Sequence, residues 1–172
     1  MINDAWADFI FLVHQTRIHN QVARLLEAGW ANIEALKKLG QAERVWLQPG
    51  ELARCYLPWY ETPLGSCPWS TPRAEPLSIH RWSLLYCQGE DVPGKDRVEH
   101  LAKTPQWIGR DGPLLVIEDT SLGVRLVAEG SKRACAAVVT AMPIQAVLFR
   151  SLYSHALFPS DFLPHILKLK CQ

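Results

Sequence analysis

The chain has 172 residues and a mass of 19.4 kDa, a length that suits one compact domain with an appended helical segment. Its 18 lysine and arginine residues against 17 aspartate and glutamate residues give a formal charge of +1, which excludes a strong overall attraction to nucleic acid, membranes or acidic partners. No apolar run approaches the about 20 residues that cross a bilayer, and the acidic start is unlike a signal peptide, so we expect a cytoplasmic protein without membrane insertion.

Helices are predicted in the first part of the chain. Between Trp6 and Leu39 the apolar residues recur at intervals of three and four, which is the helical period. The following segment, residues 49–76, carries six of the twelve prolines and many turn-forming residues. We therefore interpret residues 1–48 as an N-terminal helical extension and residues 49–76 as a Pro-rich connecting loop.

From residue 77 onward short elements alternate, which predicts an α/β (α+β) core with a small mixed sheet over residues 77–172. In chain order we expect a strand at 77–87, a helix at 96–104 capped by Asp96, hairpin strands at 114–118 and 124–128, a helix at 131–141, a strand at 144–149 and a terminal helix at 159–170. Pro105 and Pro143 follow the helices predicted at 96–104 and 131–141 and block their continuation.

One short motif carries chemistry, where the second hairpin strand runs into the next helix. The sequence there is Glu129-Gly130-Ser131-Lys132-Arg133. The unpaired N–H groups of a first helical turn, together with the helix dipole, attract anions. Gly130 permits a sharp turn and Ser131 can donate a hydrogen bond, while Lys132 and Arg133 bring positive charge. The motif predicts a phosphate site; an ordinary strand-to-helix junction with two solvated basic residues is the competing interpretation.

The order of these elements around Gly130-Ser131-Lys132-Arg133 resembles the ParB/sulfiredoxin superfamily, whose core runs strand, short helix, strand hairpin, phosphate-binding G-x-x-R turn, helix and final strand. The resemblance covers residues 77–150 and implies that the turn binds ATP or another nucleoside triphosphate. Sulfiredoxin-like members also present to ATP a basic residue, a small polar residue three positions on and a threonine four further on. Arg97, His100 and Thr104 have this spacing, with His100 in the small polar place.

Departures from the family pattern narrow the expected reaction. Ser131 stands where sulfiredoxin has its catalytic cysteine, which argues against reduction of a cysteine sulfinic acid. Too few residues follow the last predicted strand for the helix-turn-helix of a centromere-binding ParB. The short plasmid fertility-inhibition proteins of this superfamily are the better comparison. This resemblance implies ATP hydrolysis, DNA binding or DNA nuclease activity, and inhibition of conjugation-related DNA transfer.

Hydrolysis would need an acidic residue and a divalent metal. We interpret Glu129 and Arg133 as catalytic residues, and Glu129 with Asp119 as ligands of Mg²⁺. Acidic residues are also common in hairpin turns, which is the competing interpretation of Asp119. Two other functions remain open: a non-catalytic inhibitor that binds a conjugation or secretion-system protein, and a kinase for free serine or a similar small hydroxyl substrate.

Overall fold

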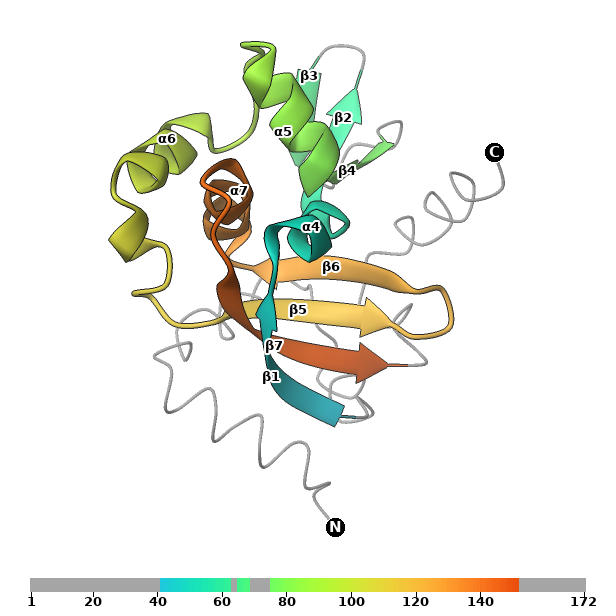
Figure 1. Cartoon of the computed structure of the whole chain (residues 1–172). Coiled ribbons are helices and arrows are strands. Elements are labelled where there is room, and N and C mark those ends of the chain that lie inside the picture. The colour runs from blue at the N-terminus through green and yellow to red at the C-terminus, as the bar shows by residue number, and fades with distance from the viewer. Residues whose placement is uncertain (1–40, 63–64, 69–74, 152–172) are drawn as a thin grey trace.

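The computed structural model describes residues 41–62, 65–68 and 75–151, which form an α/β fold on one mixed sheet (Figure 1). Its elements are β1 (Gln41–Leu47), α4 (Pro49–Ala53), β2 (Tyr56–Thr62), β3 (Gly65–Pro68), β4 (Glu75–Ser78), α5 (Ile79–Cys87), α6 (Lys95–Lys103), the 3₁₀ helix η1 (Pro105–Trp107), β5 (Leu114–Asp119), β6 (Val124–Glu129), α7 (Ser131–Val139) and β7 (Ile144–Ser151). The predicted α/β (α+β) class is confirmed. The helices expected within 6–39 and at 159–170 lie outside the described residues.

Within the described residues the sheet has seven strands, in the order β1-β7-β5-β6-β2-β3 with β4 paired to β2. The β5–β6 hairpin and the β1–β7 pair are antiparallel, whereas the pairs β5–β7 and β2–β6 are parallel. Parallel neighbours cannot be joined by a tight turn, and the connection from β5 to β7 runs through β6 and α7. The predicted hairpin and the helix that follows it are therefore present.

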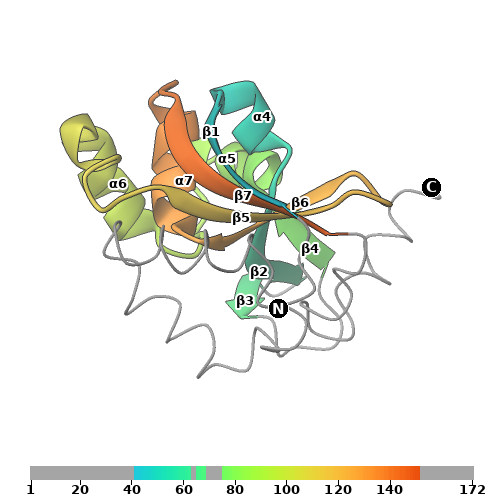
Figure 2. The same cartoon turned by 90° about the horizontal axis from the view of Figure 1, so that it is seen from below.

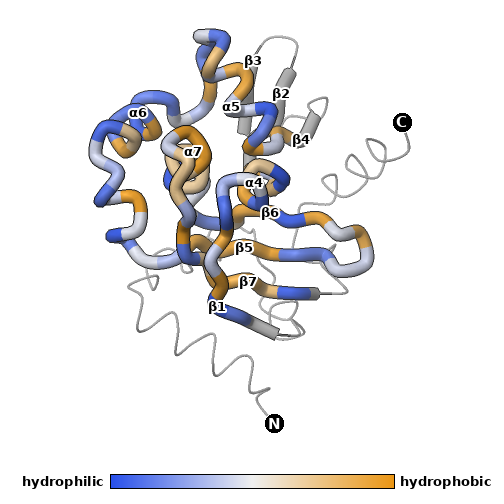
Figure 3. Tube along the Cα trace, viewed as in Figure 1, coloured by the Kyte–Doolittle hydropathy of each residue, from blue (hydrophilic) through white to orange (hydrophobic). Residues whose placement is uncertain are grey.

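Helices α4 to α7 lie over one face of the sheet (Figure 2). α7 is at the centre of this layer, because it contacts α4, α5 and α6 as well as β5 and β6. Its residues Ala134 to Ala137 are fully buried, and such small side chains let neighbouring helices approach closely. Figure 3 shows the hydrophobic stretches of the central strands and of α7 beside the more hydrophilic α6.

Strand β5 is buried on both faces of the sheet. Leu114 and Val116 belong to the core under the helices. Leu115 and Ile117, which alternate with them and point to the opposite face, are also buried. This explains why the strand reads as an unbroken apolar run in the sequence, as is usual for strands covered on both sides. No helix among the described residues has the length and apolarity needed to cross a bilayer.

The strand expected at 77–87 is wrong, because β4 ends at Ser78 and α5 begins at Ile79. The Ser78 Oγ accepts a hydrogen bond from the Arg81 N–H at 3.1 Å, which is a helix N-cap. Ile79 and Trp82 are the buried residues of this helix and have helical spacing. Leu77 and Ile79 also alternate as in a strand, which hides the start of the helix.

The described parts of residues 1–48 and 49–76, predicted as a helical extension and a connecting loop, instead contain strands of the sheet. Residues 41–47 form β1, which pairs along its whole length with β7. Pro49 opens α4, where a proline is tolerated because the first N–H groups of a helix have no partner, and the Gln48 N–H donates to Glu51 Oε2 at 2.9 Å. Strands β2 and β3 follow within 49–76. The sheet therefore includes strands that precede residue 77, where the predicted core begins.

We expect Trp82→Ala to lower the free energy of unfolding by about 3 to 5 kcal/mol. The ring of Trp82 is fully buried, stacks on Tyr86 with centroids 5.2 Å apart, and donates its indole N–H to the Pro93 carbonyl at 3.1 Å. Urea denaturation followed by far-UV circular dichroism measures the loss. The control is Trp107→Ala, whose ring is 42% exposed and whose removal should cost less than about 1 kcal/mol. Equal losses in both variants would contradict the packing described for α5.

Candidate functional site

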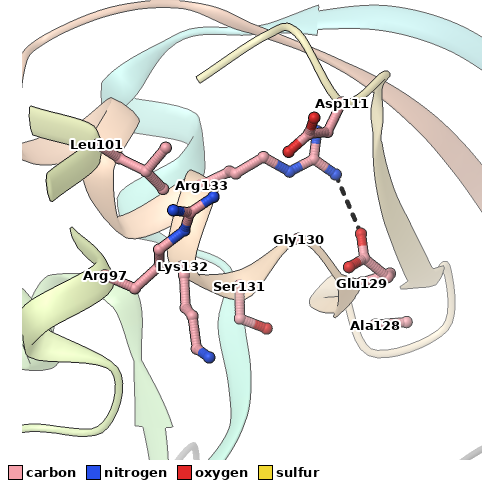
Figure 4. A pocket seen from close by; sticks show the side chains of 9 residues that line it. All are labelled: Arg97, Leu101, Asp111, Ala128, Glu129, Gly130, Ser131, Lys132 and Arg133. Carbon is pink, nitrogen blue, oxygen red and sulfur yellow. Dashed lines mark hydrogen bonds and ion pairs between the residues drawn. The ribbon is translucent and has the colours of Figure 1, made fainter. Parts of the chain in front are cut away.

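A pocket of about 310 Å³ lies where the first turn of α7 meets α6 (Figure 4). Arg97 and Leu101 line it from α6, and Asp111 lines it from the loop before β5. The remaining lining residues are 128–133, at the end of β6 and the start of α7. All five residues of the predicted phosphate turn therefore surround one cavity, and Arg97 lies on its wall.

Gly130 is the N-cap of α7 and has a left-handed backbone with φ of +87°. A Cβ at this position would overlap Cδ2 of Leu114, so only glycine fits both the backbone angle and the space. The helix begins with the Ala134 N–H donating to the Gly130 carbonyl at 2.9 Å. Gly130 has no side chain to cap the first turn, which leaves the early N–H groups of α7 available to an anion.

The guanidinium of Arg133 connects the start of β5 to the end of β6 beside the pocket. It donates to the carbonyls of Gly112 and Pro113, just before β5, and to the Glu129 carboxylate at 3.0 Å, at the end of β6. Arg133 is only 6% exposed and Glu129 is partly exposed. The predicted catalytic pair is therefore an ion pair that holds the turn in shape (Figure 4). Arg133 acts in this geometry as a positioning residue.

Lys132 and Arg97 bring positive charge to the pocket. Both are exposed, both line the pocket, and neither forms an ion pair with another residue that the structure describes. The aliphatic chain of Lys132 passes over Gly94, where a Cβ would lie 3.0 Å from Lys132 Cγ. Gly94 is the N-cap of α6, again left-handed and without a side-chain cap. The N-termini of two helices thus lie close to one another and to the pocket.

His100 and Thr104, two of the three residues that the family resemblance presents to ATP, are directed away from the pocket. His100 meets the ring of Trp107 edge-on, with centroids 6.2 Å apart. The Thr104 hydroxyl donates to the His100 carbonyl at 2.8 Å, at the end of α6. Neither lines the pocket. α6 buries Val98 and Leu101 in the core. With the helix in this orientation, Arg97 and one side of Leu101 line the cavity.

Asp119 does not join Glu129 in a metal site. It is 2% exposed, and its Oδ1 accepts hydrogen bonds from the N–H groups of Ser121 and Leu122 at 2.9 and 3.0 Å and from the Ser121 hydroxyl. It pairs with Val124 at the turn of the hairpin, whereas Glu129 pairs with Leu115 at the other end. The described residues contain no group of three or more His, Cys, Asp and Glu that could hold a metal. The prediction of Glu129 and Asp119 as joint Mg²⁺ ligands is wrong, and the turn interpretation of Asp119 holds.

Sequence reasoning missed Leu101, Asp111 and Ala128 as lining residues. Asp111 precedes Gly112 and Pro113, a composition that signals only a turn. Leu101 and Ala128 read as ordinary core residues, and both are in fact buried. No local signal in the sequence could have placed these residues at the pocket, because their position depends on the packing of α6 against α7.

The buried thiols of the described residues are poor nucleophiles. Cys135 lies in α7 and is fully buried, and burial raises the pKa of its thiol well above the ordinary value. Burial likewise raises the pKa of Cys55 to about 12. A thiol reacts through its thiolate, so neither cysteine suits a redox site.

Comparison of the chain with protein-family models, curated proteins and solved structures finds no match. The resemblance to the ParB/sulfiredoxin superfamily therefore stays a prediction. The structure contributes the α/β class and the succession of hairpin β5–β6, glycine turn, α7 and β7.

We expect Gly130→Ala to lower the free energy of unfolding by about 3 kcal/mol, which combines the strain of a positive φ with the overlap of Cβ and Leu114. Gly123→Ala is the matched control. Gly123 also has a positive φ, of +61°, but a Cβ there meets nothing within 4 Å, so only about 1 kcal/mol of strain should appear. Urea denaturation measures both values. Equal losses would show that the Leu114 contact has no effect.

Arg133→Ala should destabilise the fold by about 3 kcal/mol, because it leaves the Glu129 carboxylate and two carbonyl groups without their donor. The control is Arg150→Ala. Arg150 also bridges two acidic residues, Glu43 and Glu118, but its side chain is 39% exposed, and such surface pairs contribute less than about 1 kcal/mol. Thermal unfolding of both variants under identical conditions makes the comparison. A smaller loss for Arg133→Ala than for Arg150→Ala would remove Arg133 from its positioning role.

Proposed function

We propose that the chain binds the phosphate groups of a nucleoside triphosphate, in the first place ATP, in the pocket at the N-terminus of α7. The observation that carries this proposal is the uncapped first turn of α7, which opens into a cavity with two cations, Arg97 and Lys132, that are free of ion pairs within the described residues. Helix N-termini and lysine side chains are the usual protein partners of phosphate. The volume of about 310 Å³ accommodates a small ligand.

We further propose that the bound ATP is hydrolysed. In this step water attacks the γ-phosphorus, the bond between that atom and the β-γ bridging oxygen breaks, and ADP leaves. Glu129 is the acidic residue next to the phosphate turn, and its hydrogen bond from Arg133 fixes the carboxylate while the side chain stays 23% exposed. A carboxylate held in this way can orient the water and accept its proton. Since the described residues form no metal cluster, any Mg²⁺ would enter with the nucleotide phosphates.

The biological setting that we propose comes from the ParB/sulfiredoxin resemblance. The short plasmid fertility-inhibition proteins of that superfamily suggest DNA as a further ligand or substrate, and inhibition of conjugation-related transfer as the process. A cytoplasmic location, where nucleoside triphosphates are abundant, belongs to the same proposal. The non-catalytic inhibitor of a conjugation or secretion-system protein and the serine-type kinase are the alternatives that the following experiment separates.

Lys132→Ala should weaken ATP binding about tenfold, because a charged hydrogen bond to phosphate is lost. Glu129→Gln should keep or improve ATP affinity, since it removes a negative charge from the pocket, but should lower ADP release by at least about 100-fold. The control is Lys103→Ala, an exposed lysine of α6 that does not line the pocket. Isothermal titration calorimetry measures affinity, and a coupled assay measures ADP release.

The same purified protein is incubated with Mg²⁺-ATP alone, with plasmid DNA and with free serine. Formation of phosphoserine would identify a kinase. Cleavage of the plasmid would show that the protein also has nuclease activity. ATP binding that is unaffected by Lys132→Ala would show that the site is misplaced. No binding and no turnover in any tube would reject the nucleotide function and leave the non-catalytic inhibitor.

A further inference from the structure

Trp107 forms an exposed aromatic surface at the end of η1. Its ring is 42% exposed, although tryptophan is usually buried to a large extent. The guanidinium carbon of Arg110 lies over the ring, 5.1 Å from its centroid, and His100 contacts the ring at an interplanar angle of 90°. Two basic side chains therefore hold the tryptophan in a defined orientation at the surface.

The fold does not need Trp107 for its core. The next residue, Ile108, is 2% exposed and anchors this segment, and Leu101 does the same for the end of α6. An indole ring left outside these anchors contributes little to the stability of the domain. Its exposure, with a cation over one face, is the arrangement by which proteins offer a stacking surface to flat ligands.

Trp107 belongs to the same segment of the chain as one wall of the pocket, although its ring does not line the pocket. Leu101 and Asp111 both line the pocket, and they are the chain neighbours of His100 and Arg110, the two residues that hold the ring. Consecutive Cα atoms are about 3.8 Å apart, so the backbones of His100 and Arg110 adjoin the pocket wall, while their side chains and Trp107 lie outside the pocket lining. A ligand whose charged end occupies the pocket can extend over this wall.

We propose that Trp107 and Arg110 form the platform on which the base of the bound nucleotide stacks, while its phosphates lie at the first turn of α7. This inference rests on the proposed nucleotide function and adds the part of the ligand that the phosphate pocket does not hold. Every nucleobase has a flat π face that stacks on aromatic rings and on guanidinium planes. Because stacking tolerates any base, the platform accepts purine and pyrimidine nucleotides.

The test compares ATP with inorganic triphosphate, which has the phosphates but no base. Calorimetry is carried out on the full chain and on Trp107→Ala, Trp107→Phe and Lys132→Ala. Trp107→Ala should weaken ATP binding about tenfold and leave the affinity for inorganic triphosphate unchanged. Trp107→Phe should restore most of the ATP affinity, because a smaller aromatic ring still stacks. Lys132→Ala should weaken both ligands.

The outcomes separate the platform from the phosphate site. If Trp107→Ala binds ATP as the unmodified chain does while Lys132→Ala weakens it, the platform is rejected and the nucleotide function stands. Equal weakening of both ligands by Trp107→Ala also rejects the platform, since the effect would then lie in the phosphate pocket. If the unmodified chain binds neither ligand, the nucleotide function fails and the platform fails with it.

Discussion

The buried guanidinium of Arg133 is the contact on which the shape of the pocket depends. It joins the chain entering β5, the chain leaving β6 and the first turn of α7 through two carbonyl groups and one carboxylate. Only arginine has enough donors in a planar fork to serve three acceptors at once. Its charge can be buried because Glu129 neutralises it. The phosphate turn is therefore set by a charge pair that is complete before any ligand arrives.

This pairing divides the charges of the motif into two kinds. Glu129 and Arg133 neutralise each other; the buried Arg133 contributes a fixed backbone, while the Glu129 carboxylate stays 23% exposed at the pocket. Lys132 is held differently, because its methylene groups lie against Gly94 while its ammonium group stays exposed. A bound anion would thus meet a preorganised helix terminus and a flexible cation. Preorganised N–H groups need little rearrangement to stabilise negative charge.

The sequence predicts the parts of the fold whose signals are local. The β5–β6 hairpin, the glycine turn and α7 follow from two short apolar segments around a polar turn, from Gly130 and from a run of small residues. The helix α5 is missed because Leu77 and Ile79 alternate like a strand before the helical spacing begins. Strand β1 is missed because its partner β7 lies about a hundred residues away in the chain. The sequence does not predict the role of Arg133 for the same reason, since its carbonyl partners at 112–113 are distant in the chain.

The segment 94–111 is attached to the rest of the molecule mainly through three apolar side chains, Val98, Leu101 and Ile108. Several of its other positions, such as Arg97, Lys103 and Arg110, are exposed, so substitutions there have little effect on folding. The floor of the pocket tolerates fewer substitutions, because Gly130 packs against Leu114 of β5 and Arg133 is bonded to the chain at the start of β5 and the end of β6. Substitutions on this segment can therefore alter the surface around the pocket while the floor of the pocket keeps the same geometry. The chemistry of this surface and the fold beneath it thus depend on different residues.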